Sequence, residues 1–171
     1  FGISLWAGAV EIAGVAFNPS SLLISLVFFL LVAVTEELAL RGFVLERLLQ
    51  SGVNKFCALF LSAALFSLIH IGNPNFDFLS FINILLAGIL LGSSYIYTRN
   101  LCFPIALHWF WNWIQGPVLG YEVSGNKFCN GLLAHRLPAA NLINGGAFGF
   151  EGSVICTVLM IVGTGVILKL A

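Results

Sequence analysis

An almost uninterrupted run of apolar residues between positions 22 and 44 constrains this chain more than any other feature. A membrane-spanning helix needs roughly 17–25 such residues, so the run is long enough to cross a bilayer. It nevertheless contains two adjacent glutamates, Glu36 and Glu37, followed by Arg41. A charge at that depth costs about 2.5–3.5 kcal/mol on insertion scales, so ionisable residues in membrane helices usually serve a function. The run therefore predicts a transmembrane helix that carries part of a polar site.

The composition places the rest of the chain in the same class. Of the 171 residues, 60% are hydrophobic and only 8% are charged, whereas a soluble domain carries about 25% charged residues. We therefore expect an integral membrane protein. The formal net charge is zero, so there is no basic patch and no argument for nucleic-acid binding. The chain begins at Phe1, within an apolar stretch and without a basic leader, so we expect an N-terminally truncated sequence preceded by further helices.

Six apolar segments of about membrane length divide the sequence. Polar or helix-breaking residues separate them, and residues 121–151 form the longest polar, glycine-rich stretch. The sequence predicts an all-α, multi-pass transmembrane helical bundle that forms one domain over residues 1–171. In the fourth segment, Gly88 and Gly92 have the spacing that allows close helix approach, and we expect them to pack within this protein. The segments are residues 1–17, 22–44 with a helical extension to 49, 56–71, 78–97, 101–119 and 152–168.

Lysines and arginines in the loops predict the orientation of the bundle. Cytoplasmic loops carry an excess of these residues. If successive loops alternate sides, four basic residues fall on one side and two on the other, so we expect the first side to be cytoplasmic. The first set is Arg47, Lys55, Arg99 and Lys169, and the second is Lys127 and Arg136.

The two glutamates are expected to have different roles, because consecutive residues of a helix point about 100° apart. Glu37 and Arg41 are four residues apart, with the glutamate first, which is the favourable arrangement for an ion pair. Glu36 has no such local partner, and an unpaired carboxylate in an apolar site suits a general base. We assign Glu36 as the base and the Glu37–Arg41 pair as its support. The alternative is that both glutamates only pair with cations for helix packing.

Two histidines interrupt later apolar segments, His70 in the third and His108 in the fifth. A lone histidine on an apolar face is usually a core residue, but two of them beside a diglutamate helix favour a site. An imidazole can activate a water or donate a hydrogen bond to a developing oxyanion. His108 and Asn112 are four residues apart on one helix face, which suits an oxyanion hole. Phe66, one turn before His70, is expected to pack against its ring.

Other hydrolytic designs do not fit this sequence. There is no HExxH or GxSxG motif, and Asp77 is the only aspartate, so an aspartyl dyad cannot be built. The four cysteines are too scattered for a thiolate metal site. Water activation by glutamate and histidine remains, with or without a metal. Glu36, His70 and His108 could hold zinc, because two histidines and a carboxylate are a known catalytic ligand set, whereas Asn112 is a poor zinc ligand.

Three short motifs follow one another on successive segments: Glu36-Glu37-x-x-x-Arg41, Phe66-x-x-x-His70 and His108-x-x-x-Asn112. In this order they resemble the motifs of the CPBP family, the CAAX proteases and bacteriocin-processing membrane proteins related to the Ras-converting CAAX endopeptidase. The resemblance covers about residues 22–115. It implies that Glu36 and His70 activate a water and that His108 and Asn112 form the oxyanion hole. Members are usually called metalloproteases, although a metal-free glutamate mechanism is also argued, so zinc and no metal both stay open.

Two functions follow from these observations. The first is an intramembrane endopeptidase of the bacterial cytoplasmic membrane, acting on a peptide or protein delivered in or at the lipid bilayer. The second is a non-enzymatic membrane protein of the same fold that acts in bacteriocin immunity or as a scaffold or ligand binder. The intact set of Glu36, His70, His108 and Asn112 favours the enzyme.

Overall fold

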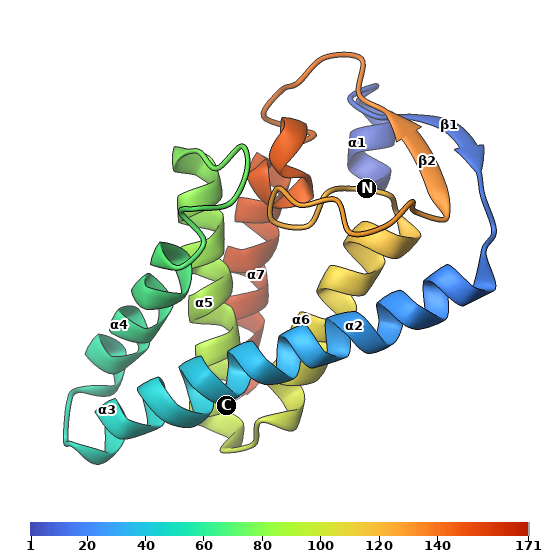
Figure 1. The fold of residues 1–171 in the computed structure, drawn as a ribbon. Helices are drawn as coiled ribbons and strands as arrows, with labels where there is room; N and C mark the ends of the chain where they lie inside the picture. The colour runs from blue at the N-terminus through green and yellow to red at the C-terminus, as the bar shows by residue number, and fades with distance from the viewer. Residues whose placement is uncertain (171) are drawn as a thin grey trace.

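A computed structural model describes residues 1–170, most of which are helical (Figure 1). Two short strands pair with each other, and several short helices connect the longer ones. The helices are α1 (Gly2–Trp6), α2 (Pro19–Glu37), the π-helix η1 (Leu38–Leu45), α3 (Glu46–Gln50), α4 (Lys55–Leu68), α5 (Phe78–Thr98), α6 (Cys102–Trp113), the π-helix η2 (Ile114–Val118), the 3-10 helices η3 (Gly146–Phe148) and η4 (Phe150–Gly152), and α7 (Val154–Leu170); the strands are β1 (Glu11–Val15) and β2 (Leu133–Arg136).

Two of the helices are long and apolar enough to cross a membrane by length and composition. One is the continuous helix Pro19–Gln50, which joins α2, η1 and α3 over 32 residues, and the other is α5, with 21 residues. α4 and α7 are apolar but shorter. The chain is therefore mostly helical with two candidate spans among the described residues, which is fewer than the six membrane segments that the sequence predicts.

The expected first membrane segment, residues 1–17, is not a membrane helix, and the prediction of an all-α fold is wrong there. α1 ends after five residues, and Gly8 then adopts a left-handed backbone conformation with φ +65°. The chain continues into β1, which pairs antiparallel with β2 so that Glu11 lies opposite Arg136. A strand satisfies its backbone groups through a partner, and this partner comes from the distant polar stretch. Apolar composition alone does not distinguish such a strand from a helix.

Short polar side chains fix where the longer helices begin. Asn18 accepts a hydrogen bond from the backbone N–H of Ser21 at 3.0 Å and precedes Pro19 in the first turn of α2. Asp77 caps α5 in the same way through the N–H of Ser80 at 2.7 Å. These residues satisfy N–H groups that have no partner inside the helix.

The helices surround the central helix α5, which packs against α4, α6 and α7. α2 is steeply inclined to α5 and packs against α6 (Figure 1). α6 runs toward the end of the molecule that holds α1 and the two strands, and α7 runs back from that end (Figure 1). The connection between α6 and α7 therefore lies at the same end as the strands.

The close approach of α4 and α5 depends on the two glycines of the fourth segment. A Cβ added to Gly88 would lie 2.8 Å from the Cα and Cβ of Ala63 on α4, which no side chain tolerates. A Cβ on Gly92 would meet the Leu59 side chain at 2.5 Å. The small-residue spacing thus serves packing within this protein, as the sequence predicts.

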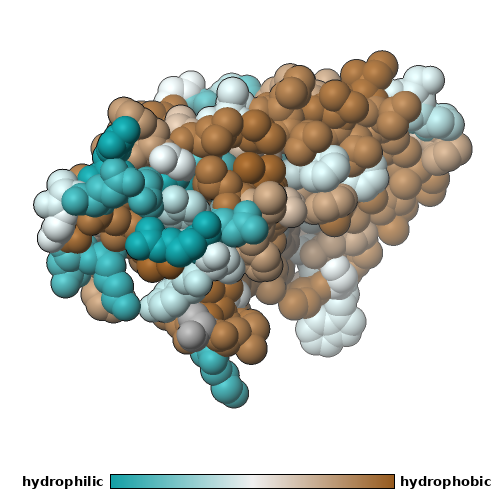
Figure 2. Space-filling model, turned by 90° about the horizontal axis from the view of Figure 1, so that it is seen from below, coloured by the Kyte–Doolittle hydropathy of each residue, from teal (hydrophilic) through white to brown (hydrophobic). Residues whose placement is uncertain are grey.

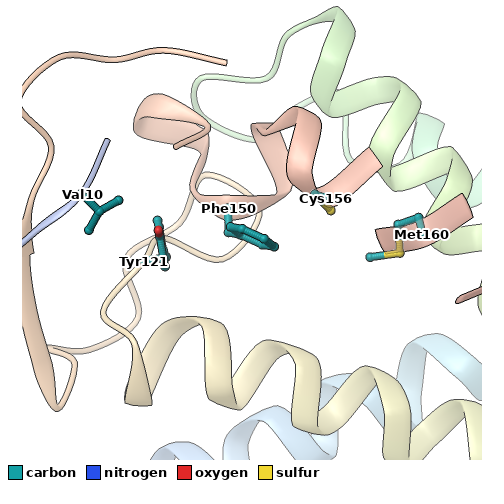
Figure 3. Close-up of a cluster of buried hydrophobic side chains, with 5 residues drawn as sticks. All are labelled: Val10, Tyr121, Phe150, Cys156 and Met160. Carbon is teal, nitrogen blue, oxygen red and sulfur yellow. The ribbon is translucent and has the colours of Figure 1, made fainter. Parts of the chain in front are cut away.

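A buried cluster joins the N-terminal segment to the α6–α7 connection and to α7 (Figure 3). Its members are Val10, Tyr121, Phe150, Cys156 and Met160. Elsewhere the surface is largely apolar. In Figure 2, which views the molecule from below, hydrophobic residues dominate and hydrophilic residues gather at the left, the side on which α3 lies in Figure 1. An apolar surface of this extent is what a lipid environment requires.

Candidate active site

A cavity of about 690 Å³ lies among α2, α5, α6 and α7 and the end of α4. Glu36, His70, His108 and Asn112 all line it, so the structure places the four candidate residues on the wall of one space. Glu36 comes from α2, His108 and Asn112 come from α6, and His70 comes from the turn that follows α4, so their juxtaposition depends on how these elements pack.

The carboxylate of Glu36 faces this cavity without a hydrogen-bond partner of its own. Its Oε2 lies 3.9 Å from Nε2 of His108, beyond hydrogen-bond distance. The same oxygen is buried and has no partner within residues 1–170, although the side chain as a whole is 30% exposed. A buried acceptor without a partner is costly and therefore indicates a water, substrate or other ligand.

Glu37 lies on a different side of the helix, where it is completely buried. Nη1 of Arg41 donates a hydrogen bond to its Oε1 at 2.8 Å, as the spacing of the two residues predicts. The same oxygen lies 2.9 Å from Nδ1 of His108. Arg41, Glu37 and His108 therefore form a connected chain of charged or polar groups that reaches the cavity.

Arg41 is held by more than its ion pair. Its Nη2 donates to the carbonyl oxygen of Gly88 at 3.2 Å, and its guanidinium lies over the ring of Phe66 at 4.6 Å. Arg41 belongs to the π-helix η1. The hydroxyl of Ser62, on α4, donates to the carbonyl of Leu40 in this π-helix at 3.0 Å. π-helical turns occur often at functional sites, and this one begins directly after the glutamate pair.

The partners of the two histidines determine which ring nitrogen carries the proton. Nδ1 of His70 lies 2.7 Å from the carbonyl oxygen of Phe66, which can only accept, so Nδ1 is protonated. The remaining nitrogen, Nε2, then presents a lone pair. Nδ1 of His108 faces the carboxylate of Glu37 and is protonated for the same reason. The Phe66 ring makes edge contacts with both imidazoles, with centroid distances of 4.8 Å to His70 and 6.0 Å to His108.

Asn112 follows His108 by one helical turn and is only 5% exposed. No hydrogen-bond partner for its side-chain amide occurs within residues 1–170, and it faces the cavity. Its amide offers two donors and an acceptor, and none of them is used by a protein group within the described residues. The side chain is thus free to bind a ligand in the cavity.

The tryptophans of α6 divide into two groups according to their hydrogen-bond partners. Trp109 and Trp113 donate to the carbonyls of Leu26 and Leu22 on α2 at 2.8 and 3.1 Å, so they join the two helices. Trp111 lines the cavity and donates to Oε1 of Glu151 at 3.0 Å.

The zinc ligand set considered from the sequence is not assembled. Within residues 1–170, no three side chains of His, Cys, Asp or Glu lie close enough together to hold one metal ion. The Nδ1 contacts with the Phe66 carbonyl and with Glu37 leave Nε2 of each histidine free, as in metal-binding histidines, so the misfit lies in the grouping of the three side chains. The donors as they stand do not fit a three-ligand zinc site.

Two features of this site were not found from the sequence. The first is the contact between Glu37 and His108, which depends on how α2 and α6 cross and leaves no pattern in the spacing. The second is Glu151, which lines the cavity from the α6–α7 connection. It stands directly before the last apolar segment, and that position alone gives no reason to bring it to the site.

Fold and site together define a mostly helical protein whose apolar body encloses a cavity with ionisable walls. The sequence model of one protein family, described as type II CAAX prenyl endopeptidase Rce1-like, matches residues 18–114. This range is more than half of the chain, so the chain belongs to the Rce1-like family, whose members are membrane-embedded proteases. The matched range includes Glu36, His70, His108 and Asn112 and ends before the α6–α7 connection. No curated protein and no solved structure matches the chain.

Proposed function

We propose that this chain is an intramembrane endopeptidase that hydrolyses peptide bonds with a water activated by Glu36 and His70. The observation that carries the proposal is the unpartnered amide of Asn112, which shares a cavity with the unpartnered Oε2 of Glu36. A donor and a proton acceptor that both lack protein partners are the two kinds of group that a hydrolytic transition state requires.

In the proposed first step, Glu36 accepts a proton from a water while the water oxygen bonds to the carbonyl carbon of the substrate. The lone pair on Nε2 of His70 holds the second hydrogen of that water. The carbonyl oxygen becomes an oxyanion. In the second step the carbon–nitrogen bond breaks, and Glu36 returns the proton to the leaving amine. No proton is lost over the cycle, because the base of the first step is the acid of the second.

The oxyanion is stabilised by Asn112 and His108. The amide N–H of Asn112 donates directly, as donors of this kind do in other acyl-transfer sites. Nδ1 of His108 already donates to Glu37, so Nε2 can donate only when the imidazole carries both protons. Glu37 stabilises that imidazolium, and Arg41 holds Glu37 in place.

The cavity also indicates the kind of substrate. One end lies between the later parts of α7 and the start of α6 and is apolar, and the other end is polar. We propose a peptide or protein that enters from the bilayer, with an apolar chain or segment beside the scissile bond. The apolar end is lined by Phe103, Leu107, Leu159, Met160, Val166 and Ile167. The multi-pass topology and the bacterial cytoplasmic membrane are part of this proposal.

The test is cleavage of an internally quenched peptide with a lipid anchor, supplied in liposomes to purified protein. Asn112→Ala removes one oxyanion donor and leaves His108, so kcat should fall by about 10²–10³. Asn100→Ala is the matched control, because Asn100 is exposed in the turn between α5 and α6. Wild-type activity in a folded Asn112→Ala protein would exclude this role, and absence of cleavage by the wild type would favour a non-enzymatic ligand binder or immunity protein.

A further inference from the structure

Residues 121–129, which we call the strap, cross the polar end of the cavity. Val123, Ser124, Asn126 and Phe128 of the strap line it. The strap lies outside the range that matches the family. Its contribution to the cavity comes from a part of the chain that the family model does not match.

Contacts from three sides fix the strap. The ring of Phe128 packs against Phe28 and Phe29 of α2, with centroid distances of 5.2 and 5.3 Å. The amide of Asn73, in the α4–α5 connection, donates to the carbonyl of Ser124 at 3.0 Å. On the side of α7, Glu151 accepts from the backbone N–H of Ser124 at 2.9 Å and from its hydroxyl at 2.7 Å. The strap is thus a fixed wall of the cavity.

Glu151 is the unusual member of this wall, because it is a carboxylate that is only 6% exposed. Oε2 accepts both bonds from Ser124, and Oε1 accepts one from Trp111. A carboxylate has about four acceptor positions, so Oε1 keeps one unused. Within residues 1–170, no lysine or arginine forms an ion pair with Glu151. A buried carboxylate without a cation is expensive and is best accounted for by a ligand that supplies one.

The other charges of the cavity support the same conclusion. Its lining contains two carboxylates, Glu36 and Glu151, and neither lysine nor arginine, while the imidazole of His108 is already paired with Glu37 through Nδ1. Asn112, the residue after Trp111, lines the same cavity, and its amide has no protein partner within the described residues, so it can bind a ligand next to this wall. A cationic group of that ligand would be stabilised there, and an anionic group would be repelled.

We infer that Glu151, with Ser124 and Asn126 of the strap, forms a substrate subsite that binds a lysine or arginine side chain of the peptide near the scissile bond. This inference rests on the proposed peptidase function. The subsite discriminates against acidic side chains at the same position.

The experiment measures kcat/KM of the wild-type protein for sets of three lipid-anchored peptides. Within a set, one position carries lysine, glutamine or glutamate. The sets together scan the positions on both sides of the scissile bond. At one position, kcat/KM should be highest for the lysine peptide, intermediate for the glutamine peptide and lowest for the glutamate peptide. The first and last should differ by about tenfold or more, as expected for a charge interaction in a partly desolvated site. This series needs no variant, so it does not depend on whether a substituted protein folds.

Variants then assign the preference to Glu151. Glu151→Gln should remove the preference for lysine over glutamate, and Glu151→Asp should retain part of it. Glu122→Gln is the control: it makes the same change in charge within the strap, at a residue that does not line the cavity. If Glu151 only holds the strap in place, Glu151→Gln should lower thermal stability while the preference for lysine over glutamate persists. Cleavage of all three peptides at equal rates overturns the subsite alone. Failure to cleave any peptide overturns the proposed function and the subsite with it.

Discussion

Glu37 and Arg41 are both completely buried, and they connect the body of the protein to a residue of the proposed oxyanion hole. Their hydrogen bonding is incomplete, because Oε2 of Glu37 and Nε of Arg41 have no partner within residues 1–170. Burying such a pair seldom adds stability compared with apolar side chains of similar size. Its retention is explained if Glu37 must orient His108 and stabilise its protonated form.

Removing the cation should be far more harmful than removing a cation at the surface. Arg41→Ala leaves the carboxylate of Glu37 buried and uncompensated, which typically costs about 3–5 kcal/mol of stability, and it should also inactivate the protein. Arg99→Ala is the control, because Arg99 pairs with Glu46 at 3.1 Å but is 62% exposed, and such pairs contribute up to about 1 kcal/mol. Thermal unfolding in detergent measures both. Equal unfolding temperatures for the two variants would show that the buried pair is dispensable.

At this scale the sequence predicts what is local and misses what is not. The four-residue spacing predicts the Glu37–Arg41 contact, because helix geometry alone brings such residues together. The contact between Glu37 and His108 joins residues 71 positions apart. This contact depends on how α2 and α6 cross, and no pattern in the neighbouring sequence predicts that crossing. Glu151 is missed for the same reason, because it reaches the cavity from a connection that is distant in the sequence.

Among the elements, the pair α4–α5 shows how small residues position the site. Gly88 contacts Ala63 closely, and its carbonyl accepts a hydrogen bond from Arg41. The distance between the two helices therefore also sets the position of the buried ion pair. A change at Gly88 should be transmitted to Glu37 and His108 through Arg41.

Gly88→Ala should destabilise the protein by about 1–3 kcal/mol, because the added Cβ would have to move the backbone of α4. Gly165→Ala on α7 is the control, since nothing lies within 4 Å of a Cβ at that position. Alanine favours a helix over glycine by roughly 1 kcal/mol, so this control should be neutral or slightly stabilising. The unfolding temperature should fall for Gly88→Ala and stay the same or rise slightly for Gly165→Ala. A Gly88→Ala protein as stable as the control would contradict the packing argument.

The later helices lie close to where the sequence predicts them, and the first segment does not. α5 begins at Phe78 as expected and ends at Thr98, and α4 and α7 differ from their predicted ranges by a few residues. Each is long, apolar and bounded by capping residues or turns. Residues 1–17 are equally apolar, but the pairing of β1 with β2 overrides that signal. Strand pairing depends on a partner more than a hundred residues away, and the spacing of apolar residues within one segment does not predict such a partner.

The molecule as a whole has two chemically different ends. The end with the α3–α4 and α5–α6 turns carries Arg47, Lys55 and Arg99, all exposed, and the opposite end carries Lys127 of the strap (Figure 1). The charge bias predicted from the loops is therefore a property of opposite ends of the fold. From the excess of basic residues at the other end, we expect the strap and the polar end of the cavity to face away from the cytoplasm.

Orientation is testable with a membrane-impermeant maleimide on intact bacterial cells that express the protein with its four cysteines replaced. Lys127→Cys, in the strap, should be labelled from outside. Arg99→Cys, in the turn after α5, should be labelled only after the cells are permeabilised. The reverse pattern would show that the bundle is inverted and that the cavity's polar end opens to the cytoplasm.

The central claim is that Glu36 is the base of a hydrolytic reaction. Glu36→Gln preserves the shape of the side chain and much of its hydrogen bonding but cannot accept a proton from water. The most direct measurement is cleavage of the lipid-anchored peptide by this variant, with thermal unfolding as a check of its fold and Glu11→Gln, an exposed residue of β1, as the matched control. We expect a loss of at least about 10²–10⁴ in kcat for Glu36→Gln and none for the control. Near wild-type cleavage by a folded Glu36→Gln protein would contradict the account.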